Sequence, residues 1–156
     1  ARLDGARLDG ARLDGARLDG ASLVGARLVG ARLDGASLVG ASLVGARLDR
    51  ARLDRAILVG ASLVGARLDG ASLVGARLDE ALGVLDCGTP HGWRVLMVRH
   101  EDGIRIAAGC RWFTFAKAVE HWRDRSDREL MQPLLSYIRA ACEINGWPLG
   151  AGKVEG

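Results

Sequence analysis

Cysteine and histidine side chains are the groups in this sequence best suited to metal binding or nucleophilic catalysis. All of them lie after residue 86. A zinc ion could draw ligands from Cys87, His91, Cys110, His121 and Cys142. Only the first two have a ligand-like Cys-x3-His spacing, and the Cys-x2-Cys pair that structural zinc sites often use is absent. We therefore expect no metal and no other cofactor.

A cysteine–histidine pair is the main enzymatic alternative, for example Cys110 with His100 across a predicted hairpin. A small buried thiol beside a surface imidazole gives the same sequence pattern without catalysis. The three cysteines are few and odd in number, which is typical of reduced thiols rather than of a disulfide framework. We predict that the protein is not an enzyme, with a small enzymatic or metal-binding C-terminal domain as the second alternative.

The elements that must position these groups belong to two different kinds of sequence, which meet near residue 80. All seven aromatic residues lie at or after Trp93. The net charge of the 156 residues is only +3, too small to indicate nucleic-acid binding by itself. No apolar run is long enough to span a membrane, and no signal peptide is visible. We expect a cytoplasmic or virion-associated protein, with further residues before Ala1.

Residues 1–80 consist of sixteen five-residue units, each with Ala first and Leu third. A period of five matches no helical repeat, and Gly at thirteen of the sixteen fifth positions would destabilise a helix by about 1 kcal/mol each. In an extended segment the Ala and Leu of one unit point the same way, while the residues flanking Leu point outward. The pattern therefore predicts a chain that coils, with Ala and Leu inside and Gly at the turns.

Tandem units of this form resemble the pentapeptide repeat family over residues 1–80. The resemblance implies a mainly β fold, a right-handed quadrilateral β-helix with four units in each coil. Sixteen units would then make four coils, and equivalent positions of successive coils, four units apart in the chain, would stack.

That stacking sorts the outward positions into faces. Two faces would carry columns of Arg beside columns of Asp, with each Arg near the Asp two positions further on. The other two would share an aliphatic stripe, which we predict to be a homo-oligomer contact or a docking face for the C-terminal domain. The alternative is that Val simply favours extended structure and tolerates exposure. The stripe consists of Val24, Val44, Val64, Val39, Val59 and Ile57.

The remaining residues predict a small α+β capping domain of ββαα type. We expect a linker or cap over 81–92, the domain over 93–149 and a frayed tail over 150–156. The strands are predicted at 93–100 and 104–114. A helix follows at 115–124, and a second begins at Ser126, with a kink or restart expected at Pro133. The predicted domain core consists of Trp93, Trp112, Phe115, Val119, Trp122, Leu130, Leu134 and Ile138, with Ala141 continuing the stripe of the last helix.

The segment GCRWFTFAKAVEHW also resembles a module that follows pentapeptide repeats in phage and prophage proteins. Together the two resemblances imply a structural or protein-binding component, a rigid rod with a docking domain, in a phage or prophage particle or its assembly. We expect protein partners, either copies of itself or a larger assembly.

The first alternative is a topoisomerase-binding protein, because some family members resemble DNA and bind DNA gyrase. Such mimicry needs an acidic rod. Residues 1–80 carry twelve Arg against nine Asp and one Glu, a net charge of 12 − 10 = +2, which disfavours this alternative.

Overall fold

A computed structural model describes residues 1–87, 94–100, 103–108, 111–123, 128–147 and 149. The chain divides into two compact units, Ala1–Leu85 and Asp86–Gly156, called here the repeat unit and the C-terminal unit. No helix in the described residues is long and apolar enough to cross a membrane.

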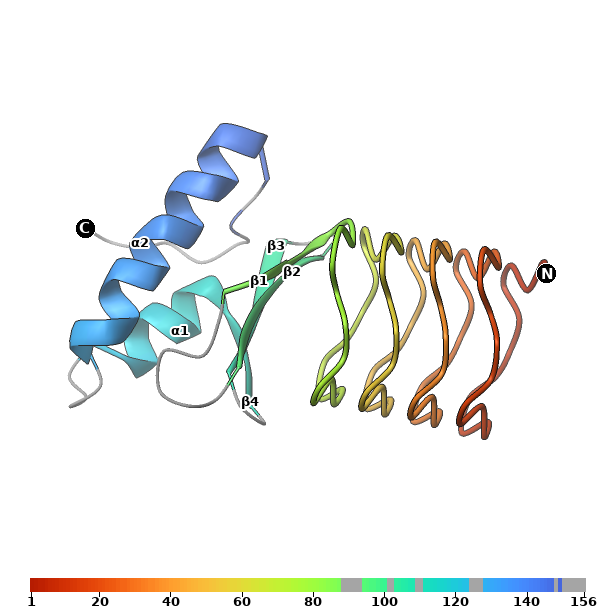
Figure 1. Ribbon diagram of the computed structural model, residues 1–156. Helices are drawn as coiled ribbons and strands as arrows, with labels where there is room; N and C mark the ends of the chain where they lie inside the picture. Colours follow the sequence, from red (N-terminus) through yellow and green to blue (C-terminus); the bar gives the residue numbers. More distant parts are fainter. Residues whose placement is uncertain (88–93, 101–102, 109–110, 124–127, 148, 150–156) are drawn as a thin grey trace. The chain divides into compact units, whose positions relative to one another are not determined.

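The repeat unit is a β-solenoid in which each coil takes four of the five-residue units (Figure 1). Parallel bridges join equivalent positions of successive coils, beginning with Arg2↔Ser22 and ending with Ser62↔Leu82. The amides of the central leucines from Leu3 to Leu63 donate to the coil that follows, as Leu3 does to the Ser22 carbonyl at 2.7 Å. The backbone polar groups are therefore paired between coils, which a single coil could not do alone.

Alanine and leucine form the core of the repeat unit. Every Ala and Leu at the first and third positions from Ala21 to Leu68 is at most 2% exposed. The four central leucines of the first coil are only half-buried, because no coil covers them from the N-terminal side in this structure. Burial of the same residue type thus depends on the coil in which it lies.

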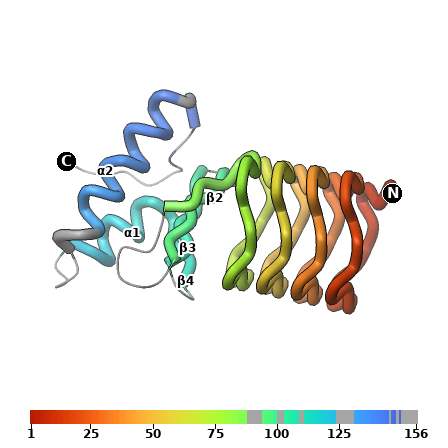
Figure 2. The backbone as a smooth tube through the Cα atoms, in the orientation of Figure 1, coloured from red at the N-terminus to blue at the C-terminus, as the bar shows by residue number. Residues whose placement is uncertain are grey.

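The fifth residue of each unit lies at a corner with left-handed backbone geometry, and the corners recur in register along the tube (Figure 2). The thirteen corner glycines have φ between 61° and 72°. Arg50, Arg55 and Glu80 adopt φ of 59°, 58° and 57° at the other three corners. A side chain in this conformation costs about 1–2 kcal/mol, so these three corners are strained where glycine would not be.

The solenoid register ends at Gly83, where a further unit would place Leu. Gly83 is buried with φ of 80°, and a Cβ atom there would lie 2.7 Å from the backbone nitrogen of Val64. The chain leaves the coil as strand β1 (Val84–Asp86). The interval 81–92, predicted as a linker or cap, therefore includes a strand; residues 88–92 lie outside the described part.

Strands β1 to β4 form one sheet in the order β1-β2-β3-β4, and β1 spans the boundary in the chain between the two units. Strand β2 (Val95–His100) pairs antiparallel with β3 (Gly103–Ala108), which pairs antiparallel with β4 (Arg111–Thr114). The single strand predicted at 104–114 is therefore wrong, because the chain reverses between Ala108 and Arg111, which pair with each other. The overlooked signal was the glycine at 109, a common turn residue between two apolar runs.

Two helices follow the sheet. Helix α1 (Phe115–His121) begins after Thr114, whose hydroxyl accepts the Lys117 amide as an N-cap, and it ends earlier than the predicted residue 124. Helix α2 (Arg128–Asn145) contains Pro133 without a break. Pro133 lies in the second turn, so the hydrogen bond that it cannot donate would have gone to the first turn. Of the two outcomes expected at Pro133, a kink or a restart, the restart was wrong, because the helix is continuous through this residue.

The buried face of α2 includes the predicted Ile138, but its other residues lie one position after the predicted Leu130, Leu134 and Ala141. Its buried residues share the spacing i, i+4, i+7, i+11, whereas Leu134 and Ala141 are only half-buried. Both sets of positions have helical spacing, so periodicity alone could not choose between them. The side chain of Leu130 lies outside the described part. The buried set is Met131, Leu135, Ile138 and Cys142.

Candidate interaction surfaces

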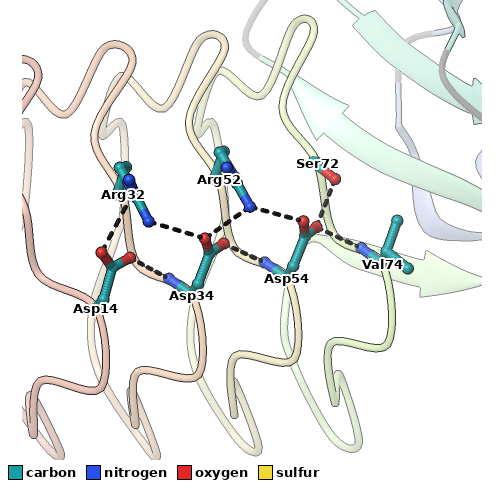
Figure 3. Close-up of polar contacts among 7 residues, drawn as sticks. All are labelled: Asp14, Arg32, Asp34, Arg52, Asp54, Ser72 and Val74. Atoms are coloured by element: carbon teal, nitrogen blue, oxygen red, sulfur yellow. Dashed lines mark hydrogen bonds and ion pairs between the residues drawn. The ribbon is translucent and has the colours of Figure 1, made fainter.

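A ladder of alternating Asp and Arg side chains runs along one face of the repeat unit (Figure 3). Arg32 Nε lies 3.2 Å from an Asp14 carboxylate oxygen, and Arg52 Nη2 lies 2.9 Å from one of Asp34. Each Arg is further from the Asp of its own unit: Arg32 is 4.0 Å from Asp34, and Arg52 is 3.8 Å from Asp54. The closer partner therefore belongs to the preceding coil, and not to the same unit as the sequence suggested, because stacking brings that coil nearer.

The same aspartates also accept backbone hydrogen bonds from the following coil. The Oδ1 atoms of Asp14, Asp34 and Asp54 accept the amides at the equivalent position of the next coil, at 3.2, 3.2 and 3.1 Å. An outward-pointing amide that would otherwise depend on water thus has a charged partner. This hydrogen-bonding role of the aspartates was not among the predictions. The coil period could have indicated it, since Asp recurs at the fourth position of stacked units.

The predicted aliphatic stripe, called here the valine stripe, lies on the outside of the repeat unit. Val24, Val39 and Val44 are 42%, 41% and 37% exposed. Val64, Val59 and Ile57 are half-buried. Large apolar side chains in such a row leave apolar surface in contact with water, which typically marks a site of association.

Two arginines stand at corners rather than on the faces. Arg50 and Arg55 are exposed, and their Cγ atoms lie 3.4 and 3.5 Å from where a Cβ atom would sit on Gly70 and Gly75 in the next coil. Among the described residues, neither guanidinium has an ion-pair partner. Both belong to the third coil and flank the segment 51–54.

Chemistry-bearing residues of the C-terminal unit do not gather into a site within the described residues. Burial, with a smaller effect of the neighbouring Asp86 charge, raises the pKa of the Cys87 thiol to about 11. Burial likewise raises the pKa of Cys142, which packs with its sulfur 3.9 Å from that of Met97. A protonated thiol is a poor nucleophile and a poor metal ligand.

The other residues proposed for metal binding or catalysis do not form a site within the described residues either. The ring of His121 belongs to a cluster with those of Phe113 and Trp122, in which its centroid lies 4.9 Å from each and the other two lie 5.0 Å apart. Within the described residues, no three His, Cys, Asp or Glu side chains are placed to hold a metal ion. Both His91 and Cys110 lie outside the described part, as does the side chain of His100.

The predicted core residues of the C-terminal unit vary in burial. Phe115, Trp122 and Ile138 are 1%, 2% and 0% exposed. Trp112, Val119 and Leu134 are half-buried. Trp93 lies outside the described part. The Arg139 guanidinium stacks 5.4 Å from the Phe115 ring centroid, which joins α2 to the start of α1.

The similarity of this chain to a known family lies in its five-residue repeats. Residues 1–38 and 46–82 match the family described as pentapeptide repeats, in eight copies. The chain is similar to the pentapeptide repeat protein Rfr23 from the cyanobacterium Cyanothece 51142, with 34% identity over 52% of this chain and 52% of that chain and a TM-score of 0.33. It is also similar to a pentapeptide repeat protein from Nostoc PCC 7120, with 36% identity over 46% of this chain and 64% of that one and a TM-score of 0.31.

A third similar structure is QnrB1, described as a plasmid-mediated fluoroquinolone resistance protein. Its identity is 23% over 51% of this chain and 44% of that chain, with a TM-score of 0.24. This chain thus spans 52% and 64% of the lengths of the first two proteins. No curated protein matches it.

Proposed function

The N-terminal unit of this chain is a pentapeptide-repeat domain, and from that premise we propose that the protein is a non-enzymatic scaffold that associates with copies of itself through the valine stripe. Pentapeptide repeats form a right-handed β-helix and are protein-interaction modules. The spacing of the bridges supports four coils of four units each, and the square cross-section is what the family resemblance implies. The C-terminal unit, which follows the last coil in the chain, acts as its cap.

The exposure of the valine stripe carries this proposal. Val24 and Val44 lie one above the other, since equivalent positions of successive coils stack, and Val39 lies one unit before Val44 in the chain. All three are more than a third exposed. A flat row of β-branched side chains can pack against an identical row around a two-fold axis, which removes both from water.

The role of the valine stripe in self-association can be tested without disturbing the fold, because the chain itself has Asp at equivalent positions of another coil. Asp4 occupies the position of Val24 one coil earlier and accepts the Val24 amide at 3.1 Å. We therefore expect Val24→Asp and Val44→Asp to fold while losing self-association. Val74→Asp is the matched control. Val74 is 71% exposed and lies outside the stripe, on the face that carries the ladder of Asp and Arg side chains, called here the Arg–Asp face.

Sedimentation equilibrium of the full chain measures the outcome. The proposal requires a concentration-dependent oligomer that Val24→Asp/Val44→Asp converts to monomer and that Val74→Asp leaves intact. A wild-type chain that stays monomeric at high concentration, or a control variant that dissociates equally, would contradict it.

Membership of a phage or prophage particle, with a virion-associated rather than cytoplasmic location, is the narrower form of the proposal. It is supported by the resemblance of the segment around Phe115 to modules of phage proteins. Mass spectrometry of purified particles and soluble lysate from the native source tests it. A fixed stoichiometry in particles supports the assignment, and recovery only from the soluble fraction rejects it.

The DNA-mimicking alternative is disfavoured by the charge distribution. On the Arg–Asp face, Asp14 and Asp34 each have an Arg within 3.2 Å, so these carboxylates do not present an uncompensated negative column. A topoisomerase supercoiling assay checks this argument, since potent inhibition by the purified chain would overturn it.

A further inference from the structure

Arg50 and Arg55 are the positively charged corner residues of the repeat unit, and the ladder of Asp and Arg does not account for them. Every other described Arg of the second, third and fourth coils stands before the central Leu and has a carboxylate within 4.0 Å. The first-coil arginines occupy the same ladder position but have no preceding coil in this structure. Arg50 and Arg55 do not stand before a central Leu, and they do not belong to the first coil.

Their backbone geometry shows that neither residue is required by the fold. Both adopt left-handed φ values that glycine adopts at thirteen equivalent corners without strain. Their amides still pair with the next coil, at 2.9 Å for Arg50 and 2.8 Å for Arg55, but any residue with an N–H would make those bonds. What the arginine side chains add is two positive charges at the surface.

The positions of Arg50 and Arg55 bring their two positive charges to the same side of the solenoid. Arg50 and Arg55 stand at the two ends of a single side of the third coil, one unit apart in the chain. Their stems lie against Gly70 and Gly75 of the following coil, so both lean in the same direction along the solenoid. Arg52 lies between them and is held by Asp34 at 2.9 Å, which leaves the middle of this side internally neutralised.

We propose that Arg50 and Arg55 form a two-point docking site for an acidic protein segment that lies across this side of the third coil. The inference rests on the protein-binding role proposed above but uses a different face from the valine stripe. Guanidinium groups bind carboxylates through paired, charge-assisted hydrogen bonds. A segment with two carboxylates separated by uncharged residues meets both corners and avoids Asp54 between them.

Asp54, which lies between the corners, and Asp34, one coil earlier, select against a nucleic acid. Asp34 and Asp54 side chains are 22% and 29% exposed, so a strand laid across this side would bring phosphates close to carboxylates. A phosphate backbone carries a charge at every nucleotide and cannot skip these positions. A protein segment can place its charges only at the ends of the side.

Binding of labelled probes to the full chain, followed by fluorescence anisotropy at ~50 mM salt, tests the site. The probes are a Gly-Ser peptide with two glutamates separated by uncharged residues, the same peptide with glutamines, and an oligothymidine strand. We expect the glutamate peptide to bind and Arg50→Gly/Arg55→Gly to weaken it at least ~10-fold. The variant restores the corner consensus, so its unfolding midpoint should equal or exceed that of wild type.

Arg2→Ser/Arg17→Ser is the matched control, because it removes the same charge from exposed first-coil positions that hold Ser in the next coil. It should change peptide affinity by less than ~2-fold, apart from general screening. The proposal is overturned if wild type does not bind the glutamate peptide, if the corner variant binds normally, or if the control variant loses as much. Tighter, corner-dependent binding of oligothymidine would overturn it in favour of a nucleic-acid site. The association state measured for the valine stripe is independent of each of these outcomes.

Discussion

Truncation of one central leucine should destabilise the repeat unit by an amount that depends on its coil. Leu43 is fully buried, with a coil on either side, whereas Leu3 holds the same position in its unit but is half-buried. Leu→Ala in a packed core costs ~2–5 kcal/mol, through lost burial and the cavity left behind. We expect Leu43→Ala to cost ~3 kcal/mol or more, and Leu3→Ala to cost about half as much or less, in proportion to its smaller burial.

Hydrogen exchange measured by mass spectrometry gives the two free energies for the repeat unit alone. The four tryptophans all lie after residue 92, so intrinsic fluorescence would report only on the other unit. Because coils stabilise their neighbours, Leu43→Ala should lower the protection of amides in the coils on both sides. Equal losses for the two variants, or a loss confined to the mutated unit, would refute the idea of one continuous core.

Other predictions concern the ladder, the end of the solenoid and the buried thiol. Asp34→Asn keeps an acceptor for the amide of the next coil but loses the pair with Arg52, so urea unfolding should show a cost of less than ~1 kcal/mol, against ~1–2 kcal/mol for Asp34→Ala. Comparable costs would argue against the hydrogen-bonding role. Gly83→Ala should lower the unfolding midpoint more than Gly60→Ala, because both have positive φ but only the former would drive a Cβ into backbone, at 2.7 Å; equal shifts would show that the end of the coil yields freely. The Cys87 pKa of about 11, raised from 9.0, makes its thiolate fraction at pH 8 about 100-fold smaller than in the unfolded chain. Alkylation should accelerate as pH rises toward 11, and rapid alkylation at pH 8 in the folded chain would contradict this burial.

The repeat unit could be predicted closely because its pattern is redundant. Sixteen copies of Ala-x-Leu define the inward positions, and the period excludes a helix without reference to any tertiary contact. The sequence could not by itself show which charged groups meet across coils. Arg32 and Asp34 belong to the same unit, yet the nearer partner of Arg32 is Asp14 of the preceding coil, because coils stack closely and a unit's own side chains diverge.

The C-terminal unit was less predictable, since its elements occur once each. The capping hydroxyl of Thr114 and the extent of the last helix had local signals, namely a cap residue and Asn-Gly at its end. The reversal after Ala108 had only a single glycine as a signal, and it was overlooked. For α2, two registers one position apart were equally apolar, and packing chose the one that buries Leu135 rather than Leu134.

What the sequence alone determined is therefore the coil: small and large apolar residues inside, glycine at the corners, and an end of the repeats near residue 80. These features follow from local rules of side-chain direction and backbone freedom, which need no partner. Only the tertiary structure decided how the outward residues combine. Stacking of each coil on the next joined Asp and Arg of different coils, set how far each valine of the predicted stripe is exposed, and placed Arg50 and Arg55 at two ends of one side. None of these contacts could be read along the chain, because contact across coils depends on distance in space.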